Sequence, residues 1–118
     1  MKSARNKYNA RRGSVAGKRF DSTAETRRFA ELSRLLRVGK ISELRRQVSY
    51  ELIPAQYDEN GRLLERAVTY KADFVYERDG VTVVEDVKGV RTKDFVIKRK
   101  LMLYVHKIKL VEIEERKK

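Results

Sequence analysis

Two aspartates and a lysine near the middle of the chain have the spacing of a metal-dependent hydrolytic site. Asp73 is followed, after twelve intervening residues, by the triplet Asp86-Val87-Lys88. Mg²⁺ prefers oxygen ligands, which the two carboxylates and the backbone carbonyl of Val87 can supply. A lysine beside them can orient or deprotonate the attacking water, or stabilise charge that develops on a phosphoryl oxygen. This pattern predicts the hydrolysis of phosphodiester bonds.

The flanking residues predict the β-hairpin that would bring these groups together. Residues 70–77 and 81–88 are rich in Val, Tyr, Phe and Thr, and the dipeptide Asp79-Gly80 between them is typical of a two-residue hairpin turn. With this turn as the loop, Asp73 lies opposite Asp86 on the neighbouring strand. Like charges in that position destabilise a sheet, and a bound divalent cation would remove the cost.

The same register sorts the side chains between the two faces of the hairpin. One face is expected to carry Lys71, Asp73, Val75, Val84, Asp86 and Lys88, with Lys71 opposite Lys88. Glu85 points to the other face and would become a ligand only if a bulge shifted the strand by one residue. The alternative for the acidic pair and its lysines is a surface ion-pair ladder without catalytic function.

A third carboxylate stands at the start of a predicted helix. Residues 20–25 open this helix, which should run to about Val38, with Gly39 as its left-handed stop. Ser22 and Glu25 have the S-x-x-E spacing of a capping box, which is one explanation for the glutamate. The other is that Glu25 extends the apolar stripe of the helix toward the core and joins the two aspartates.

The remaining segments complete a mixed α/β pattern. Strands are expected at residues 47–53, 62–76 and 107–113, a connector at 41–44, a turn at 58–61, and a second helix at about 93–105 behind Thr92 or Asp94. The order helix, strand, strand, strand, helix, strand predicts an α/β fold: an αβββαβ core in which helices flank a mixed sheet.

Composition excludes several classes of protein. The chain of 118 residues is long enough for one domain with a single modest core. It has no cysteine and one histidine, which excludes disulfide scaffolds, thiolate zinc sites and histidine-rich metal sites. No apolar run reaches about 18 residues, so no membrane span is expected. The absence of cysteine fits a reducing cytoplasm, and the net charge of +12 indicates a polyanionic partner, with nucleic acid the leading candidate.

The N-terminal segment is the most basic part of the chain. Residues 1–20 contain seven lysines and arginines and no acidic residue. We expect a flexible basic arm over residues 1–19 and the folded domain over 20–118. The arm either keeps the protein soluble or lies along a phosphate backbone. The residues expected to contact DNA are Lys7, Arg11, Arg12, Lys18, Arg19, Lys71, Arg91, Lys93 and Lys98.

These motifs resemble those of the PD-(D/E)XK nuclease superfamily. Ala72-Asp73 stands where that superfamily has Pro-Asp, and Asp86-Val87-Lys88 matches its (D/E)-x-K triplet. The segments KYNA (7–10), FDSTAE (20–25), YKADF (70–74) and VVEDVKG (83–89) are more closely similar to a small phage-encoded family, long labelled a domain of unknown function. Its members are thought to be endonucleases akin to Holliday-junction resolvases. The similarity covers roughly residues 7–113.

The resemblance implies a restriction-endonuclease-like core, Mg²⁺ or Mn²⁺ as cofactor, and a defined set of residues. The implied catalytic residues are Glu25, Asp73, Asp86 and Lys88, and the implied metal ligands are Asp73, Asp86, Val87 and Glu25. Gln47 and Tyr70 fall where such relatives have polar residues near the site. The implied partners are branched or structured DNA, phage recombination or packaging proteins, and a second copy of the chain, because such enzymes are commonly dimers.

Two other functions fit parts of the sequence. A non-catalytic DNA-binding accessory protein would explain the basic charge without any chemistry. An RNA-binding module would use Tyr70, Phe74 and Tyr76, which alternate along one strand as base-stacking platforms do. Core packing is the simpler explanation for Phe74 and Tyr76.

Overall fold

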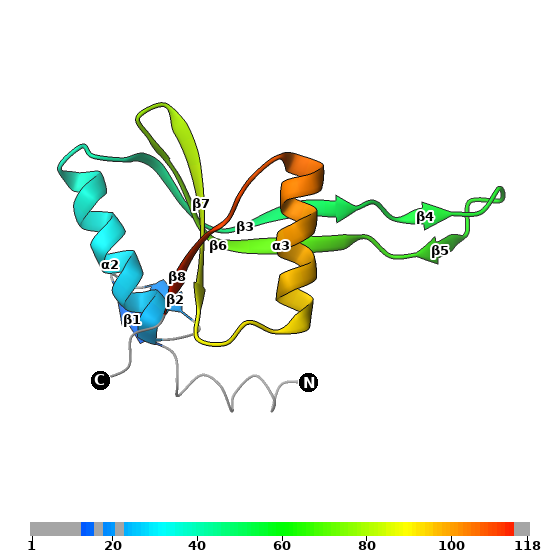
Figure 1. Cartoon of the computed structure of the whole chain (residues 1–118), viewed down its shortest axis with the longest axis horizontal. Helices are drawn as coiled ribbons and strands as arrows, with labels where there is room; N and C mark the ends of the chain where they lie inside the picture. Colours follow the sequence, from blue (N-terminus) through cyan, green and yellow to red (C-terminus); the bar gives the residue numbers. More distant parts are fainter. Residues whose placement is uncertain (1–12, 16–17, 21–22, 115–118) are drawn as a thin grey trace.

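The structure is a computed structural model that describes residues 13–15, 18–20 and 23–114. Its elements are β1 (Gly13–Val15), β2 (Lys18–Phe20), α2 (Thr23–Arg37), β3 (Ser42–Ile53), β4 (Gln56–Tyr57), β5 (Leu63–Glu65), β6 (Val68–Arg78), β7 (Val81–Lys88), α3 (Lys93–His106) and β8 (Val111–Glu114) (Figure 1). The sequence α2, β3, β6, β7, α3, β8 confirms the predicted αβββαβ core. In the described part of the chain, no helix is long and apolar enough to cross a membrane.

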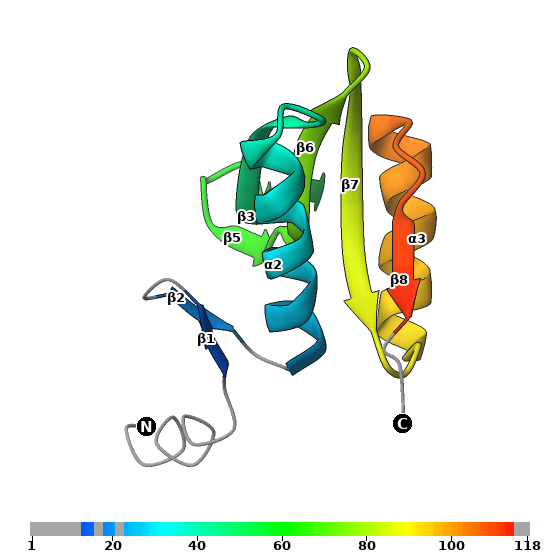
Figure 2. The ribbon, with the colours of Figure 1, turned by 90° about the vertical axis from the view of Figure 1, so that its left-hand side faces the viewer.

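The core sheet is mixed, as predicted. Its strand order is β3-β6-β7-β8, with antiparallel pairing from β3 to β7 and parallel pairing between β7 and β8. A parallel pair needs a crossover connection, which α3 provides. The two helices cover opposite faces of the sheet (Figures 1 and 2). The strands therefore bury side chains in both directions.

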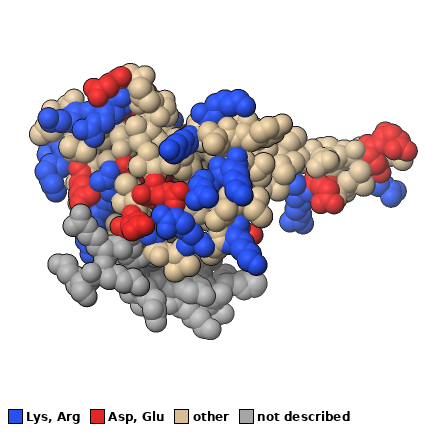
Figure 3. Space-filling model, in the orientation of Figure 1, with Lys and Arg blue, Asp and Glu red and all other residues tan. Residues whose placement is uncertain are grey.

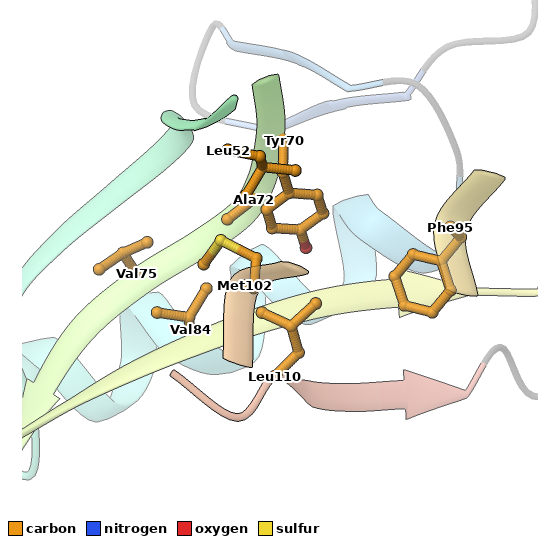
Figure 4. Packing of buried hydrophobic residues seen from close by; sticks show 8 residues of the cluster. All are labelled: Leu52, Tyr70, Ala72, Val75, Val84, Phe95, Met102 and Leu110. Carbon is orange, nitrogen blue, oxygen red and sulfur yellow. The ribbon is translucent and has the colours of Figure 1, made fainter. Parts of the chain in front are cut away.

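Each helix closes its own hydrophobic cluster. The cluster on the α3 side, called here the α3-side cluster, contains Leu52, Tyr70, Ala72, Val75, Val84, Phe95, Met102 and Leu110 (Figure 4). The α2-side cluster contains Phe29, Leu32, Ile41, Phe74 and Tyr76. Burying these apolar side chains on both faces is the main term that holds the helices on the sheet.

The ends of both helices follow the sequence signals. Gly39, just beyond α2, has φ +82°, as its role as a left-handed stop requires. Thr92 caps α3, because its Oγ1 accepts a hydrogen bond from the Phe95 N–H at 3.1 Å. Near the end of each helix an apolar residue stays open to solvent, since Leu36 and Val105 are each 42% exposed.

The β3–β6 ribbon is longer than predicted and continues beyond the sheet. β3 starts at Ser42, so the expected connector at 41–44 is wrong, and β4 and β5 extend the ribbon into a projecting hairpin (Figure 1). The turn predicted at 58–61 is confirmed. Asp58 Oδ1 accepts hydrogen bonds from the N–H groups of Asn60 (2.8 Å) and Arg62 (2.9 Å). We call residues 54–67 the arm.

The N-terminal segment is partly ordered into a small sheet. β1 and β2 pair antiparallel, with Gly13 opposite Phe20. Five residues of the arm predicted over 1–19 therefore lie in short strands, namely residues 13–15, 18 and 19. Lys18 and Arg19 belong to β2. Lys7, Arg11 and Arg12 lie outside the described residues, as does Ser22 of the expected capping box.

Candidate active site

The β6–β7 hairpin has the predicted register, and the two strands part where the acidic residues begin. Pairing runs from Arg78 opposite Val81 to Phe74 opposite Glu85. One residue further on, the side chain of Asp73 replaces a ladder carbonyl: its Oδ2 accepts a hydrogen bond from the Val87 N–H at 2.7 Å. The expectation that Asp73 and Asp86 form a regular cross-strand pair is therefore wrong. The strands open, and the Asp73 carboxylate spans the opening.

Regular alternation also breaks at this point. Ala72 packs in the α3-side cluster and Phe74 in the α2-side cluster, although residues two apart in a regular strand share a face. The strict alternation assumed in the sequence prediction does not hold here. On β3, the ladder is paired on both sides of Gln47, which lies across from Asp73. Gln47 has φ +53°, a left-handed conformation that costs a non-glycine residue about 1 kcal/mol.

The amide of Gln47 links α2 to this opening. Its Nε2 donates to Glu25 Oε2 at 2.9 Å and lies 3.5 Å from Asp73 Oδ1. Glu25 sits in the first turn of α2 and is only 4% exposed. The expectation that this glutamate points inward from its helix is confirmed. The strained backbone of Gln47 thus aims an amide between two carboxyl groups from different elements.

Asp86 is buried between a tyrosine and a lysine. The Tyr70 hydroxyl donates to Asp86 Oδ1 at 2.6 Å, and Lys88 Nζ lies 3.1 Å from Oδ2. Burial and the bond to Asp86 raise the pKa of Tyr70 far above its usual value, so the hydroxyl keeps its proton. Figure 4 shows the Tyr70 ring inside the α3-side cluster with its hydroxyl directed away from Leu52. A core side chain therefore anchors one oxygen of Asp86.

The other oxygen of Asp86 is poorly satisfied. Asp86 is 3% exposed, and among the described residues its Oδ2 has no hydrogen-bond partner. The contact with Lys88 is therefore an ion pair that lacks hydrogen-bond geometry. Lys88 Nζ also lies 4.4 Å from the centroid of the Phe95 ring, which attracts its charge. Lys71, by contrast, is exposed and faces Ser49 on β3, so the expected Lys71–Lys88 pair is wrong.

The electrostatic surroundings of Asp73 raise its pKa. Burial raises its pKa to about 6, the hydrogen bond from the Val87 N–H opposes that rise, and Asp86 and Lys88 raise and lower it respectively. Asp73, Asp86 and Lys88 therefore lie within electrostatic reach of one another. In the folded protein, the Val87 hydrogen bond and the Lys88 charge do not fully offset the cost of burying the ionised Asp73 carboxylate.

The oxygen atoms available at the site are of the type that binds a hard divalent cation. Mg²⁺ and Mn²⁺ prefer carboxylate and carbonyl oxygens, and the underbonded Oδ2 of Asp86 and the carboxylate of Asp73 are such atoms. As the side chains stand, no group of three or more His, Cys, Asp or Glu residues within 23–114 is arranged to hold a metal ion. Glu25 and Asp73 instead share the Gln47 amide, and Asp86 is held by Tyr70 and Lys88. The predicted ligand set of Asp73, Asp86, Val87 and Glu25 stays a prediction.

A comparison with protein families places the chain. The family model described as "Protein of unknown function (DUF1064)" matches residues 5–116. The chain belongs to the DUF1064 family. No curated protein and no solved structure matches it. Because the family description names no activity, the function of this DUF1064 protein has to be argued from the site itself.

Glu85, the residue held in reserve as a metal ligand, has a different role. It is fully buried on the α2 side, where Arg28 donates to its Oε1 at 2.9 Å and to its Oε2 at 2.6 Å. The Tyr76 hydroxyl donates to the same Oε2 at 2.5 Å. Burial, followed by this bond, raises the pKa of Tyr76 to about 12. Sequence reasoning missed this network, because nothing in the spacing of Arg28 shows which acid it meets.

The residues expected to bind DNA differ in availability. Lys71 and Lys93 are exposed, and Lys98 is half-buried on α3. Arg91 is engaged by Glu112 and Glu114, at 2.5 and 3.3 Å. These glutamates neutralise it, so Arg91 is a poor candidate for phosphate contact. The stacking platform required by the RNA-binding alternative is wrong, since Tyr70, Phe74 and Tyr76 are at most 4% exposed.

A groove of about 570 Å³ opens between α2 and β8 beside the site. Its lining residues are Ala24, Arg27, Arg28, Glu31, Val87, Glu112, Ile113 and Glu114. Val87 connects it to the opening that Asp73 spans. Figure 3 shows acidic atoms over β8, near the middle of this face, with basic atoms on either side. The lining carries three glutamates, each paired with an arginine, and two arginines of its own, so its charge alone does not decide whether a phosphate backbone follows it.

Proposed function

We propose that this DUF1064 protein is a metal-dependent DNA endonuclease that hydrolyses phosphodiester bonds in branched or otherwise structured DNA, in the manner of a Holliday-junction resolvase. The observation that carries the proposal is the convergence of Asp73, Asp86 and Lys88 at the opening between β6 and β7, with Glu25 joined to them through Gln47. The net charge of +12 supports a nucleic-acid substrate.

The carboxylates of Asp73 and Asp86 would hold Mg²⁺ or Mn²⁺, with Glu25 and the Val87 carbonyl completing the protein's share of the ligands. When bound, the ion supplies a water of lowered pKa and stabilises charge on the phosphoryl oxygens. Gln47 and Tyr70 act as positioning residues. The amide of Gln47 fixes the Glu25 carboxylate, and the Tyr70 hydroxyl fixes one oxygen of Asp86.

Lys88 is the proposed general base or charge stabiliser. Its ammonium is held between the Phe95 ring and Asp86, and its side chain is 27% exposed. The side chain is therefore only partly covered, and a phosphate or its attacking water could approach it. An ammonium in this position donates to a developing oxyanion, and a lysine that loses its proton can take one from the water. The same side chain is oriented before any substrate arrives.

The DNA would be held by basic residues around the site. We assign phosphate contacts to the exposed Lys71 and Lys93, to Lys98, and to the basic residues of the N-terminal segment. Such contacts predict binding that weakens steeply as salt rises. We place the reaction in the bacterial cytoplasm, during phage recombination, replication or packaging, where branched DNA arises.

The proposal is tested with metal-depleted protein on four labelled substrates: a four-way junction, a flap, a duplex and a single strand. Mg²⁺ or Mn²⁺ should restore cutting, with the junction or flap cut fastest, and Ca²⁺ should support binding without turnover. Asp73→Asn and Lys88→Met should bind DNA and fail to cut. Asp79→Asn and Lys40→Met are matched controls, because both positions are exposed and outside the site.

Two results would refute the assignment. Site variants that cut as fast as the wild type would show that these residues are not catalytic. Salt-dependent DNA binding without metal-dependent cutting, across all four substrates, would identify a non-catalytic DNA-binding accessory protein instead. In that case Asp73→Asn should strengthen binding simply because it removes a negative charge.

A further inference from the structure

The arm exposes apolar side chains that nothing covers in the described part of the chain. β4 and β5 pair with each other and pack on no other helix or strand to a substantial extent. Tyr57 is 60% exposed, Leu63 51% and Leu64 60%. Such a group of exposed apolar side chains makes the arm a candidate docking surface.

The charge of the arm favours a basic protein surface over nucleic acid. Residues 54–67 carry three acidic side chains against two basic ones, in a chain whose net charge is +12. Two of the acids, Asp58 and Glu59, sit at the turn, and Figure 3 shows acidic atoms at the tip of the projection. A phosphate backbone would be repelled there, whereas a surface with apolar patches and lysines would be attracted.

The chain itself carries such a surface on the outer side of α3. Ile97, Leu103 and Tyr104 are 53–76% exposed, and lysines are interspersed among them. Apolar residues on the solvent side of a helix indicate a face that is buried in an assembly. A groove of about 410 Å³ between α3 and β8 adjoins this face, lined by Arg99, Lys100, Leu103, Lys109, Leu110 and Glu112.

The lining of that groove includes both apolar and basic side chains. Leu103 and Leu110 supply the apolar part, and Lys100 and Lys109 are both exposed. Glu112 does not offset the lysines, because it is paired with Arg91 and Arg99. The groove thus complements an acidic, apolar hairpin in both polarity and charge.

We propose that the arm of one copy docks in the α3–β8 groove of a second copy, and that the exchange is reciprocal. Leu63 and its cross-strand partner Tyr57 would cover Leu103 and Leu110. Glu59 and Glu65 would face Lys100 and Lys109. A two-fold arrangement satisfies both arms and both grooves at once and leaves no open end for further growth. The second copy is the favoured occupant because one chain presents both complementary surfaces.

This inference does not rest on the proposed nuclease function. Its test measures mass in solution without metal or DNA, so a monomeric protein would leave the nuclease proposal untouched. Conversely, a protein without nuclease activity could still form the dimer. If both proposals hold, the reciprocal exchange sets two sites in one particle, as the cutting of two strands requires.

The test is the molar mass of the full chain by light scattering, from about 1 to about 100 μM, which brackets a micromolar dissociation constant. The wild type should approach twice 13.9 kDa. The arm variant Glu59→Lys/Glu65→Lys and the groove variant Lys100→Glu/Lys109→Glu should each be monomeric, because like charges then face each other and weaken the dimer at least about 100-fold. An equimolar mixture of the two variants should form dimers again, since each reversed arm meets a reversed groove.

The mixing step separates lost pairing from lost folding, because unfolded variants cannot rescue each other. Arg37→Glu/Lys40→Glu is the matched control: it makes the same charge change near the end of α2, on the other side of the sheet, and should leave the dimer intact. A wild type of single-chain mass throughout would overturn the proposal, as would a mixture that stays monomeric. An arm variant that loses DNA affinity in a monomeric protein would overturn it too, by assigning the arm to nucleic acid.

Discussion

Glu85 and Asp86 are neighbours on β7, both almost fully buried, and they face opposite helices. Each accepts a hydrogen bond from a tyrosine of β6: Tyr76 for Glu85 and Tyr70 for Asp86. They differ in the cation. Glu85 receives the two-pronged guanidinium of an α2 arginine, whereas Asp86 has a lysine ammonium from its own strand at 3.1 Å and one oxygen without a hydrogen bond.

The comparison shows that burial alone does not mark a functional acid. A guanidinium fork satisfies both carboxylate oxygens in fixed geometry, which closes the Glu85 side as a structural ion pair. A lysine is a flexible point charge that can move when a ligand arrives, so the Asp86 side stays open to another cation. Asp86, whose second oxygen lacks a hydrogen bond, is therefore the better candidate for a catalytic role.

The largest expected effect is on the cleavage rate, which substitution of Asp86 should lower and substitution of Glu85 should not. Under the proposed function, Asp86→Asn should lower the cleavage rate by about 10²- to 10³-fold, the size seen when a group that stabilises transition-state charge is removed. Its stability should change little, because an asparagine oxygen can still accept the Tyr70 hydrogen bond. Single-turnover cleavage and urea unfolding measure the two quantities. Asp79→Asn makes the same chemical change on an exposed turn and should alter neither.

The second effect concerns Glu85, on the α2 side of the sheet. Here we expect a loss of stability without a loss of activity. Glu85→Gln should destabilise the fold by about 3 kcal/mol, the lower end for one broken partner of a buried pair, because the arginine is 22% exposed and part of its charge can reach water. Cleavage per folded molecule should be unchanged. Adding Arg28→Met should recover part of the loss, since no unpaired charge then remains. A Glu85→Gln protein as stable as the wild type would remove the structural half of the comparison.

The sequence allowed much of this contrast to be anticipated. The Asp79-Gly80 turn fixed the hairpin register, and the register put Glu85 and Asp86 on opposite faces, as the structure has them. Local rules sufficed because turn chemistry and strand alternation act over a few residues. The αβββαβ order followed from the same local signals.

What stayed hidden depends on contacts between distant segments. Arg28 meets Glu85 across 57 residues, and no local rule selects that partner. Gln47 carries no sequence signal for its positive φ, since glycine and asparagine are the residues that usually adopt one. The break in alternation at Asp73 lies across the sheet from Gln47, and strict alternation fails there.

A third effect concerns Asp73 and its dependence on pH. Because the folded state raises the pKa of this acid to about 6, the stability it contributes is greatest below about pH 4 and is lost as pH rises through 6. Asp73→Asn removes that penalty. In metal-free buffer the variant should therefore match the wild type near pH 4 and exceed it by about 2 kcal/mol near pH 8, a figure discounted for the partial exposure of the group.

Chemical unfolding across that pH range measures the difference. At pH 8 the proposed metal site predicts a second difference. Mg²⁺ should stabilise the wild type and leave the stability of Asp73→Asn unchanged, because the ion binds the ionised carboxylate. A stability gap that does not change with pH would show that burial does not penalise Asp73.

The smallest effect concerns the backbone strain at Gln47, whose amide donates a hydrogen bond to the Glu25 carboxylate. Gln47→Ala and Gln47→Gly both remove the amide that bonds Glu25, so their difference isolates the backbone. In a regular strand, glycine is less stable than alanine by about 0.5–1 kcal/mol. At φ +53° the order should invert, with Gln47→Gly more stable than Gln47→Ala by about 1 kcal/mol in urea unfolding at a common pH. Glu85 needs no such distortion, because its partner extends from the regular helix α2, and substitutions at exposed Lys71 of β6 should show the ordinary preference for alanine. If alanine is also the more stable residue at 47, then Gln47 is unstrained, and the amide reaches Glu25 at no backbone cost.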